Sequence, residues 1–156
     1  MTTEIPQLNE HNKAEYPPMH TAEHILNQTM VRMYGCPRSR NAHIERKKSK
    51  VSYELPVCPS EAEIQKIVNA VNAVIQANMP VTEEYVKLCD VPTEVSLEKL
   101  PADASETIRL VRVGDYDVCA CIGAHVSNTS EIGTFQLLGT NWDEERKSFR
   151  IRFKLV

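Results

Sequence analysis

Residues 60–79, SEAEIQKIVNAVNAVIQANM, predict a helix more strongly than any other stretch of the chain. Ser60 followed by Glu63 matches a capping box, in which two side chains satisfy backbone N–H groups at a helix start. Apolar residues then recur at the i, i+3, i+4, i+7 spacing that creates one apolar face, namely Ile64, Ile67, Val68, Val71, Val74 and Ile75. The stretch therefore predicts an amphipathic helix that runs to about Met79 and stops at Pro80.

A second helix and several strands are predicted around this one. Residues 20–34 again show apolar side chains at helical spacing, and Gly35 followed by Pro37 provides the stop. Strand-like patterns occur at 51–55, 81–88, 107–113, 116–121, 134–138 and 148–155. This order predicts an α+β domain of two layers, with the helices packed on one face of a mostly antiparallel sheet.

The composition is that of an ordinary globular domain. Of 156 residues, 42% are hydrophobic and 25% are charged, and no apolar run approaches the length of a membrane span. We expect one folded domain at 19–156 after a polar leader at 1–18, which has neither the basic start nor the apolar stretch of a signal peptide. A cytoplasmic location is therefore expected, and the odd number of five cysteines favours reduced thiols.

Four potential metal ligands occur as two pairs that are far apart in the sequence. His20 and His24, in HTAEHIL, are four residues apart, so a helix places their β-carbons about 5–6 Å from each other. Cys121 and His125, in CIGAHVSNTSEIGTF, have the same spacing, and three imidazoles with one thiolate suit a borderline-soft ion such as zinc. Each pair alone also fits ordinary surface or core residues, and Cys119 is a rival for Cys121 because residues two apart in a strand share a face.

Basic residues are concentrated in one part of a chain whose formal net charge is −3. The cluster consists of Arg38, Arg40, Arg46, Lys47, Lys48 and Lys50. A solvated charged strand and loop is one interpretation, and a patch that contacts nucleic-acid phosphates is the other. Arg150 and Arg152 alternate with apolar residues in the last predicted strand, as on an exposed strand face.

The two motifs closely resemble those of the editing domain shared by alanyl- and threonyl-tRNA synthetases and by free-standing alanyl-tRNA editing proteins of the AlaX type. That family has a His-x-x-x-His on a helix and a Cys-x-x-x-His followed by a Ser-Asn-Thr-like run. In this chain the matching residues are His20 and His24, then Cys121 and His125, which lead into Ser127, Asn128 and Thr129. The resemblance covers about residues 19–154.

The resemblance implies a zinc-dependent trans-editing hydrolase that removes a wrong amino acid from the acceptor end of a tRNA. It assigns His20, His24, Cys121 and His125 to the metal, with the first three as catalytic residues. Seryl-tRNA for alanine is the expected substrate. The alternatives are an editor of seryl-tRNA for threonine and a non-catalytic, zinc-stapled module that binds RNA or a synthetase. The family's synthetases commonly carry two glycines and a threonine where this chain has Ile122, Gly123 and Ala124, so the identity of the amino acid stays open.

Further residues are expected to contact the substrate if the resemblance holds. Substrate recognition is assigned to Ser49, Asn128, Thr129, Arg150 and Arg152, and tRNA phosphates are assigned to Arg46, Lys47, Lys48 and Lys50. For Ser49, Asn128 and Thr129 the alternative is ordinary turn chemistry, in which such side chains bond to nearby backbone groups.

Overall fold

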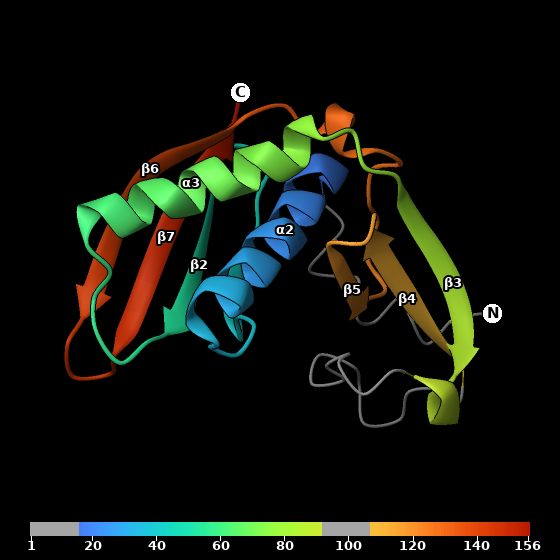
Figure 1. Cartoon of the computed structure of the whole chain (residues 1–156), viewed down its shortest axis with the longest axis horizontal. Coiled ribbons are helices and arrows are strands. Elements are labelled where there is room, and N and C mark those ends of the chain that lie inside the picture. Colours follow the sequence, from blue (N-terminus) through green and yellow to red (C-terminus); the bar gives the residue numbers. More distant parts are fainter. Residues whose placement is uncertain (1–15, 92–106) are drawn as a thin grey trace.

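The computed structural model describes residues 16–91 and 107–156 and has the predicted α+β architecture (Figure 1). The elements in chain order are α2 (Pro17–Tyr34), β1 (Asn41–His43), β2 (Ser49–Glu54), α3 (Glu61–Gln76), β3 (Val81–Lys87), η2 (Leu88–Asp90), β4 (Thr107–Val113), β5 (Asp117–Ala120), η3 (Thr129–Glu131), β6 (Phe135–Asp143) and β7 (Ser148–Leu155). Most of the expected leader, residues 1–15, lies outside the described residues.

Helix α2 begins earlier than the sequence analysis predicted. Pro17 and Pro18, which were assigned to the leader, form its first turn. Proline is well suited there, because its φ is already helical and the N–H that it lacks would have no helical partner. The helix ends as expected at Gly35, which has a φ of 67° and donates its N–H to Val31 O at 2.8 Å. The helix therefore includes two residues that were assigned to the leader, and the division into a leader and a folded domain stays a prediction.

Helix α3 forms as its capping box predicted. Glu63 N donates to Ser60 Oγ at 3.2 Å, and Ser60 N donates to a Glu63 carboxylate oxygen at 2.9 Å. The helix ends at Gln76, before the predicted limit. Its Asn72 side chain makes two hydrogen bonds with the backbone of Phe135, of 2.8 and 3.0 Å, and these join the helix to β6.

The strands divide into two antiparallel sheets, where the sequence analysis predicted a single one. Their orders are β1-β2-β7-β6 and β3-β4-β5. Figure 1 shows α3 lying across the four-stranded sheet, with α2 between α3 and β5. Strand β1 was not predicted, and β6 extends well beyond 134–138, with a register irregularity between Leu137 and Gly139. Helix α2 therefore contacts elements of both halves of the molecule.

Burial around α2 explains its central place in the structure. Apolar side chains such as Leu26 and Met30 are fully buried, but so are polar side chains of the same helix, among them Thr21 and Asn27. Because buried polar groups require partners, such residues mark contacts that the apolar periodicity does not reveal. Within the described part of the chain, no helix has the length and apolar character needed to cross a membrane.

Candidate metal centre

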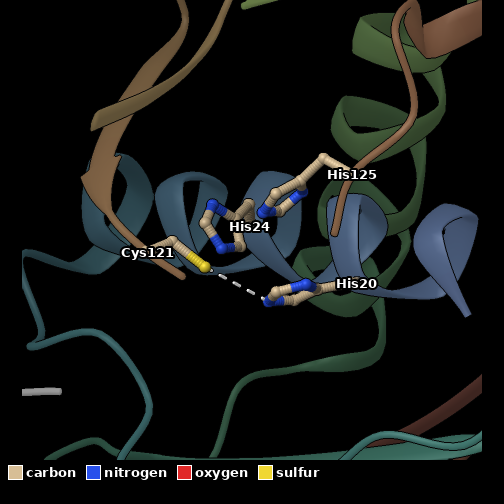
Figure 2. A group of neighbouring side chains, drawn as sticks. All are labelled: His20, His24, Cys121 and His125. Atoms are coloured by element: carbon tan, nitrogen blue, oxygen red, sulfur yellow. Dashed lines mark hydrogen bonds between the residues drawn. The ribbon is translucent and has the colours of Figure 1, made fainter. Parts of the chain in front are cut away.

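The two predicted ligand pairs meet at one place in the structure. Potential ligand atoms of His20, His24, Cys121 and His125 all lie within 4.8 Å of one another. Figure 2 shows the two α2 histidines facing Cys121 and His125, which come from the segment after β5. These four residues could hold a metal ion, and their role as ligands stays a prediction.

The cluster is compact, and Cys121 rather than Cys119 belongs to it. The Cys121 Sγ lies 3.5 Å from His20 Nε2 and accepts the Gly123 N–H at 3.4 Å. The rings of His20 and His125 are stacked with centroids 4.2 Å apart. Because β5 ends at Ala120, the two cysteines are not in one continuous strand, and the argument that they share a face does not apply.

Each histidine of the cluster has an oxygen atom on its Nδ1 side. His20 Nδ1 donates to Ala124 O at 3.1 Å, because a carbonyl oxygen can only accept. His125 Nδ1 bonds to the Thr21 hydroxyl at 2.9 Å, and His24 Nδ1 lies 3.7 Å from Asp117 Oδ2. Such backing orients imidazoles in metal sites, and it leaves Nε2 of each ring available for an ion.

Two buried histidine nitrogens of the cluster have no hydrogen-bond partner within the described residues. They are His24 Nδ1, beside Asp117, and His125 Nε2. Buried polar atoms in native proteins nearly always have a partner, so the unsatisfied Nε2 of His125, in a set of three imidazoles and a thiol, fits a site for a cation. The residues present therefore suit a transition-metal ion.

The electrostatics of the cluster favour the ligand form of its cysteine. Burial by itself would raise the pKa of Cys121, but the surrounding imidazoles, His24 first, lower that pKa to about 2. Burial lowers the pKa of His125 to about 4, so this ring is neutral at pH 7. Metal ligands must be thiolate and neutral imidazole, and the lowered pKa values of Cys121 and His125 favour these forms.

Thr21 is a residue of the site that the sequence analysis missed. It is fully buried, and its hydroxyl bonds to His125 Nδ1 and accepts the Val126 N–H at 3.2 Å. The only signal in the sequence was its position inside HTAEHIL, and that position does not reveal that Thr21 contacts the distant His125. Thr21 connects α2 to the loop that carries His125.

Replacing Thr21 with valine should weaken metal binding by about 10–100-fold, the usual effect of removing an outer partner of a ligand. Thr21→Ser should retain most of the affinity because it keeps the hydroxyl. Affinity is measured by competition with a chromogenic chelator. Thr29→Val is the matched control, since that buried hydroxyl of α2 bonds to Ile25 O and to Tyr116 instead. Equal affinities of Thr21→Val and wild type would contradict the role of Thr21.

Asn128 makes a contact of the turn type that the simpler interpretation predicts, whereas Thr129 bonds to backbone groups at the end of α3, far away in the sequence. The fully buried Thr129 hydroxyl accepts the Met79 N–H at 2.9 Å and donates to Ile75 O at 3.0 Å. The Asn128 side chain accepts the Ser130 N–H at 2.8 Å and so caps η3. Their assignment to substrate recognition stays a prediction, and these contacts do not support it.

The other residues assigned to the substrate lie on the four-stranded sheet. The buried Ser49 hydroxyl bonds to both the N–H and the carbonyl oxygen of Glu45, at 3.0 and 3.2 Å. Arg150 and Arg152 are exposed on β7, and the Arg152 side chain lies over Gly139 of the neighbouring strand. Ser49, the first residue of β2, thus bonds to the backbone of the preceding turn, and the two arginines form a surface face; the roles of all three in substrate binding stay predictions.

The residues assigned to tRNA are exposed and lie in the turn between β1 and β2 and at the start of β2; we call Arg46, Lys47, Lys48 and Lys50 together the basic turn. The Arg46 guanidinium lies over the Tyr16 ring, 4.4 Å from its centroid. Tyr16 directly precedes α2, so the basic turn is held beside the end of the helix that carries His20. Arg38, which belongs to the same basic cluster in the sequence, instead forms an ion pair with Asp117.

Comparisons with known proteins also show similarity to alanyl-tRNA editing proteins and to tRNA synthetases. Residues 108–152, which include Cys121 and His125, match the family described as threonyl and alanyl tRNA synthetase second additional domain. The chain is 33% identical over 86% of its length to alanyl-tRNA editing protein AlaX-L of Pyrococcus horikoshii. It is 27% identical over 83% of its length to alanyl-tRNA editing protein Aarsd1 of Danio rerio, and 30% identical over 76% to an alanine–tRNA ligase of Leptospira biflexa.

The similarity covers most of this chain but a minor part of each relative. The chain spans 32% of the length of AlaX-L, 31% of Aarsd1 and 13% of the ligase. The predicted resemblance is confirmed: most of the chain is similar to one part of the alanyl-tRNA editing proteins AlaX-L and Aarsd1 and of alanine–tRNA ligases.

Proposed function

We propose that this chain is a trans-editing deacylase that hydrolyses mischarged aminoacyl-tRNA, with seryl-tRNA for alanine as its substrate. The observation that carries the proposal is the convergence of His20, His24, Cys121 and His125 at one centre. The similarity to AlaX-L and Aarsd1, which are both alanyl-tRNA editing proteins by name, supports it. A synthetase site shaped for alanine rejects serine only to a limited extent, so a separate editing pocket has a physical purpose.

Zinc is the ion that this centre would hold. Three imidazoles and one thiolate match its preferred ligands, and the four residues that supply them are those already named. The chemistry that zinc supplies when bound is Lewis-acid charge, either at the amino group or at the ester carbonyl of the substrate. The contribution to catalysis that we assign to His20, His24 and Cys121 is to hold this ion.

The proposed reaction is hydrolysis of the ester between the amino acid and the terminal ribose. The hydroxyl of a water molecule adds to the carbonyl carbon, the ester C–O bond breaks, and the ribose oxygen takes up a proton. The basic turn would contact tRNA phosphates, which provide affinity without reading sequence. Its contact with Tyr16, next to the helix of His20, favours a substrate whose phosphates lie near the metal centre.

Deacylation assays test the proposal directly. The zinc-loaded protein is incubated with seryl-tRNA for alanine and, separately, with seryl-tRNA for threonine, with alanyl-tRNA and threonyl-tRNA as controls. Rapid loss of serine from the alanine tRNA alone is the expected result. Loss of serine from the threonine tRNA alone would support the alternative, an editor of seryl-tRNA for threonine. No loss above the uncatalysed rate would refute the enzyme proposal.

A non-catalytic module is the second candidate function, because four protein ligands complete a tetrahedral zinc site. Structural zinc sites are closed in this way, whereas catalytic sites keep an open position. In that case the zinc would stabilise a domain that binds RNA or a synthetase. Removal of zinc would then lower Tm strongly. The zinc-loaded protein would hydrolyse none of the aminoacyl-tRNAs faster than the uncatalysed rate.

Replacing Lys47 and Lys48 together with glutamine should weaken binding of all tRNAs by a similar factor. Each lost phosphate contact reduces the slope of log K against log salt by about 0.9 in a duplex region. The slope is measured by titrating labelled tRNA at several salt concentrations. Lys66→Gln, on the exposed side of α3, is the control and should leave the slope unchanged. Unchanged slopes in the double variant would exclude these lysines from the interface.

A further inference from the structure

A buried ion pair lies directly behind the metal centre. Arg38, in the segment between α2 and β1, donates from Nη1 to Asp117 Oδ1 at 2.7 Å and from Nη2 to Oδ2 at 3.3 Å. The Arg38 side chain is 16% exposed and that of Asp117 is 1% exposed. Two parallel bonds to one carboxylate fix its plane as well as its position, so Asp117 is held in one orientation.

The carboxylate that Arg38 holds faces a histidine of the cluster. His24 Nδ1 lies 3.7 Å from Asp117 Oδ2, is buried and has no hydrogen-bond partner among the described residues. A small rotation of the ring would bring the two atoms within hydrogen-bond distance. The other two histidines already have such a partner, in Ala124 O and the Thr21 hydroxyl, so Asp117 completes the set.

The same pair also controls the position of the cysteine. Asp117 is the first residue of the four-residue strand β5, and Cys121 follows the last one. Arg38 therefore holds the first residue of the strand that leads to Cys121, and that same residue faces His24 of α2. The carboxylate of Glu23, the buried neighbour of His24, also interacts electrostatically with Arg38.

We propose that Arg38 is a positioning residue for the metal centre, which acts by holding Asp117 against His24. This inference rests on one part of the proposed function, which is that the cluster binds a metal, and it does not depend on deacylation. A purely structural role explains the pair less well, because removing two charges from water has a free-energy cost that the pair's attraction only partly offsets. The exposed pair of Arg112 with Glu84 avoids that cost.

Metal titrations of variants test the inference without any measurement of catalysis. Zinc affinity is measured by chelator competition, and the absorption spectrum of the cobalt(II) form reports ligand geometry. Arg38→Gln and Asp117→Asn should each weaken zinc binding by about 10–100-fold and alter the cobalt spectrum, and Arg38→Lys should restore part of the affinity. Arg112→Gln should bind as wild type does.

A double variant keeps the test valid if either single variant folds poorly. Arg38→Gln combined with Asp117→Asn leaves no unpaired buried charge, and its zinc affinity should still fall by about 10–100-fold because the carboxylate beside His24 is lost. Wild-type affinity and spectrum in a folded double variant would overturn the inference. If that result accompanied normal deacylation of seryl-tRNA, the proposed function would stand. Absence of metal binding by the wild type would overturn the inference as well.

Discussion

Replacing Cys121 with serine is expected to abolish tight zinc binding and to slow deacylation of seryl-tRNA by more than about 100-fold, since loss of an outer partner alone costs 10–100-fold. The thiol is the soft donor of the set, and the cluster holds its pKa at about 2, so it is a thiolate before any metal arrives. A serine hydroxyl stays protonated at neutral pH and is a poor zinc ligand. Zinc content and initial rates of ester hydrolysis measure the two effects.

Cys119→Ser is the matched control for this experiment. Cys119 is a buried cysteine only two residues away, in the same segment of the chain, but the cluster of potential ligands does not include it. Its substitution should leave zinc content and deacylation close to the wild-type values. If Cys119→Ser lost zinc and Cys121→Ser kept it, the assignment of the ligands would be wrong.

The sequence predicted best the helices and strands whose formation depends on residues close together in the chain. The capping box at Ser60 and the apolar face that follows it were sufficient for α3, and alternation was sufficient for the strands 107–113 and 148–155, whose limits match the structure. Periodicity does not say which strands pair, so the division into two sheets could not be predicted. Strand β1 has three exposed residues and no alternating burial to reveal it.

For the candidate site, too, the sequence predicted the residues of the motifs but not the residues that surround them in the structure. The motifs identified the four potential ligands, but the residues that orient them are not close in sequence to the residues they touch. Thr21 contacts His125, and Arg38 contacts Asp117 79 residues away. Threonine, arginine and aspartate are common on protein surfaces, so only the folded structure reveals that Thr21 and Asp117 are buried beside the cluster, with Arg38 partly buried behind them.

Replacing Phe153 with alanine is expected to be among the most damaging changes to the fold. Phe153 is fully buried in β7, between β2 and β6, and its ring stacks on Phe135 with centroids 4.6 Å apart. Truncating a buried phenylalanine costs about 3–5 kcal/mol, because the lost apolar contacts add to the cost of the cavity. Total stabilities of single domains are only about 5–15 kcal/mol, so a large part of the stability would be lost.

Urea denaturation of the wild type and of Phe153→Ala measures this loss. A lower midpoint with an unchanged slope would show that the variant is destabilised while the unfolding transition exposes the same surface. Tyr85→Ala, at a position 68% exposed on β3, is the control and should change stability by less than about 0.5 kcal/mol. If both variants unfolded at the wild-type midpoint, the Phe135 and Phe153 stack would not be part of the stabilising core.

Because β2 pairs with β7 and follows the basic turn, loss of Phe153 should also weaken tRNA binding near the unfolding midpoint.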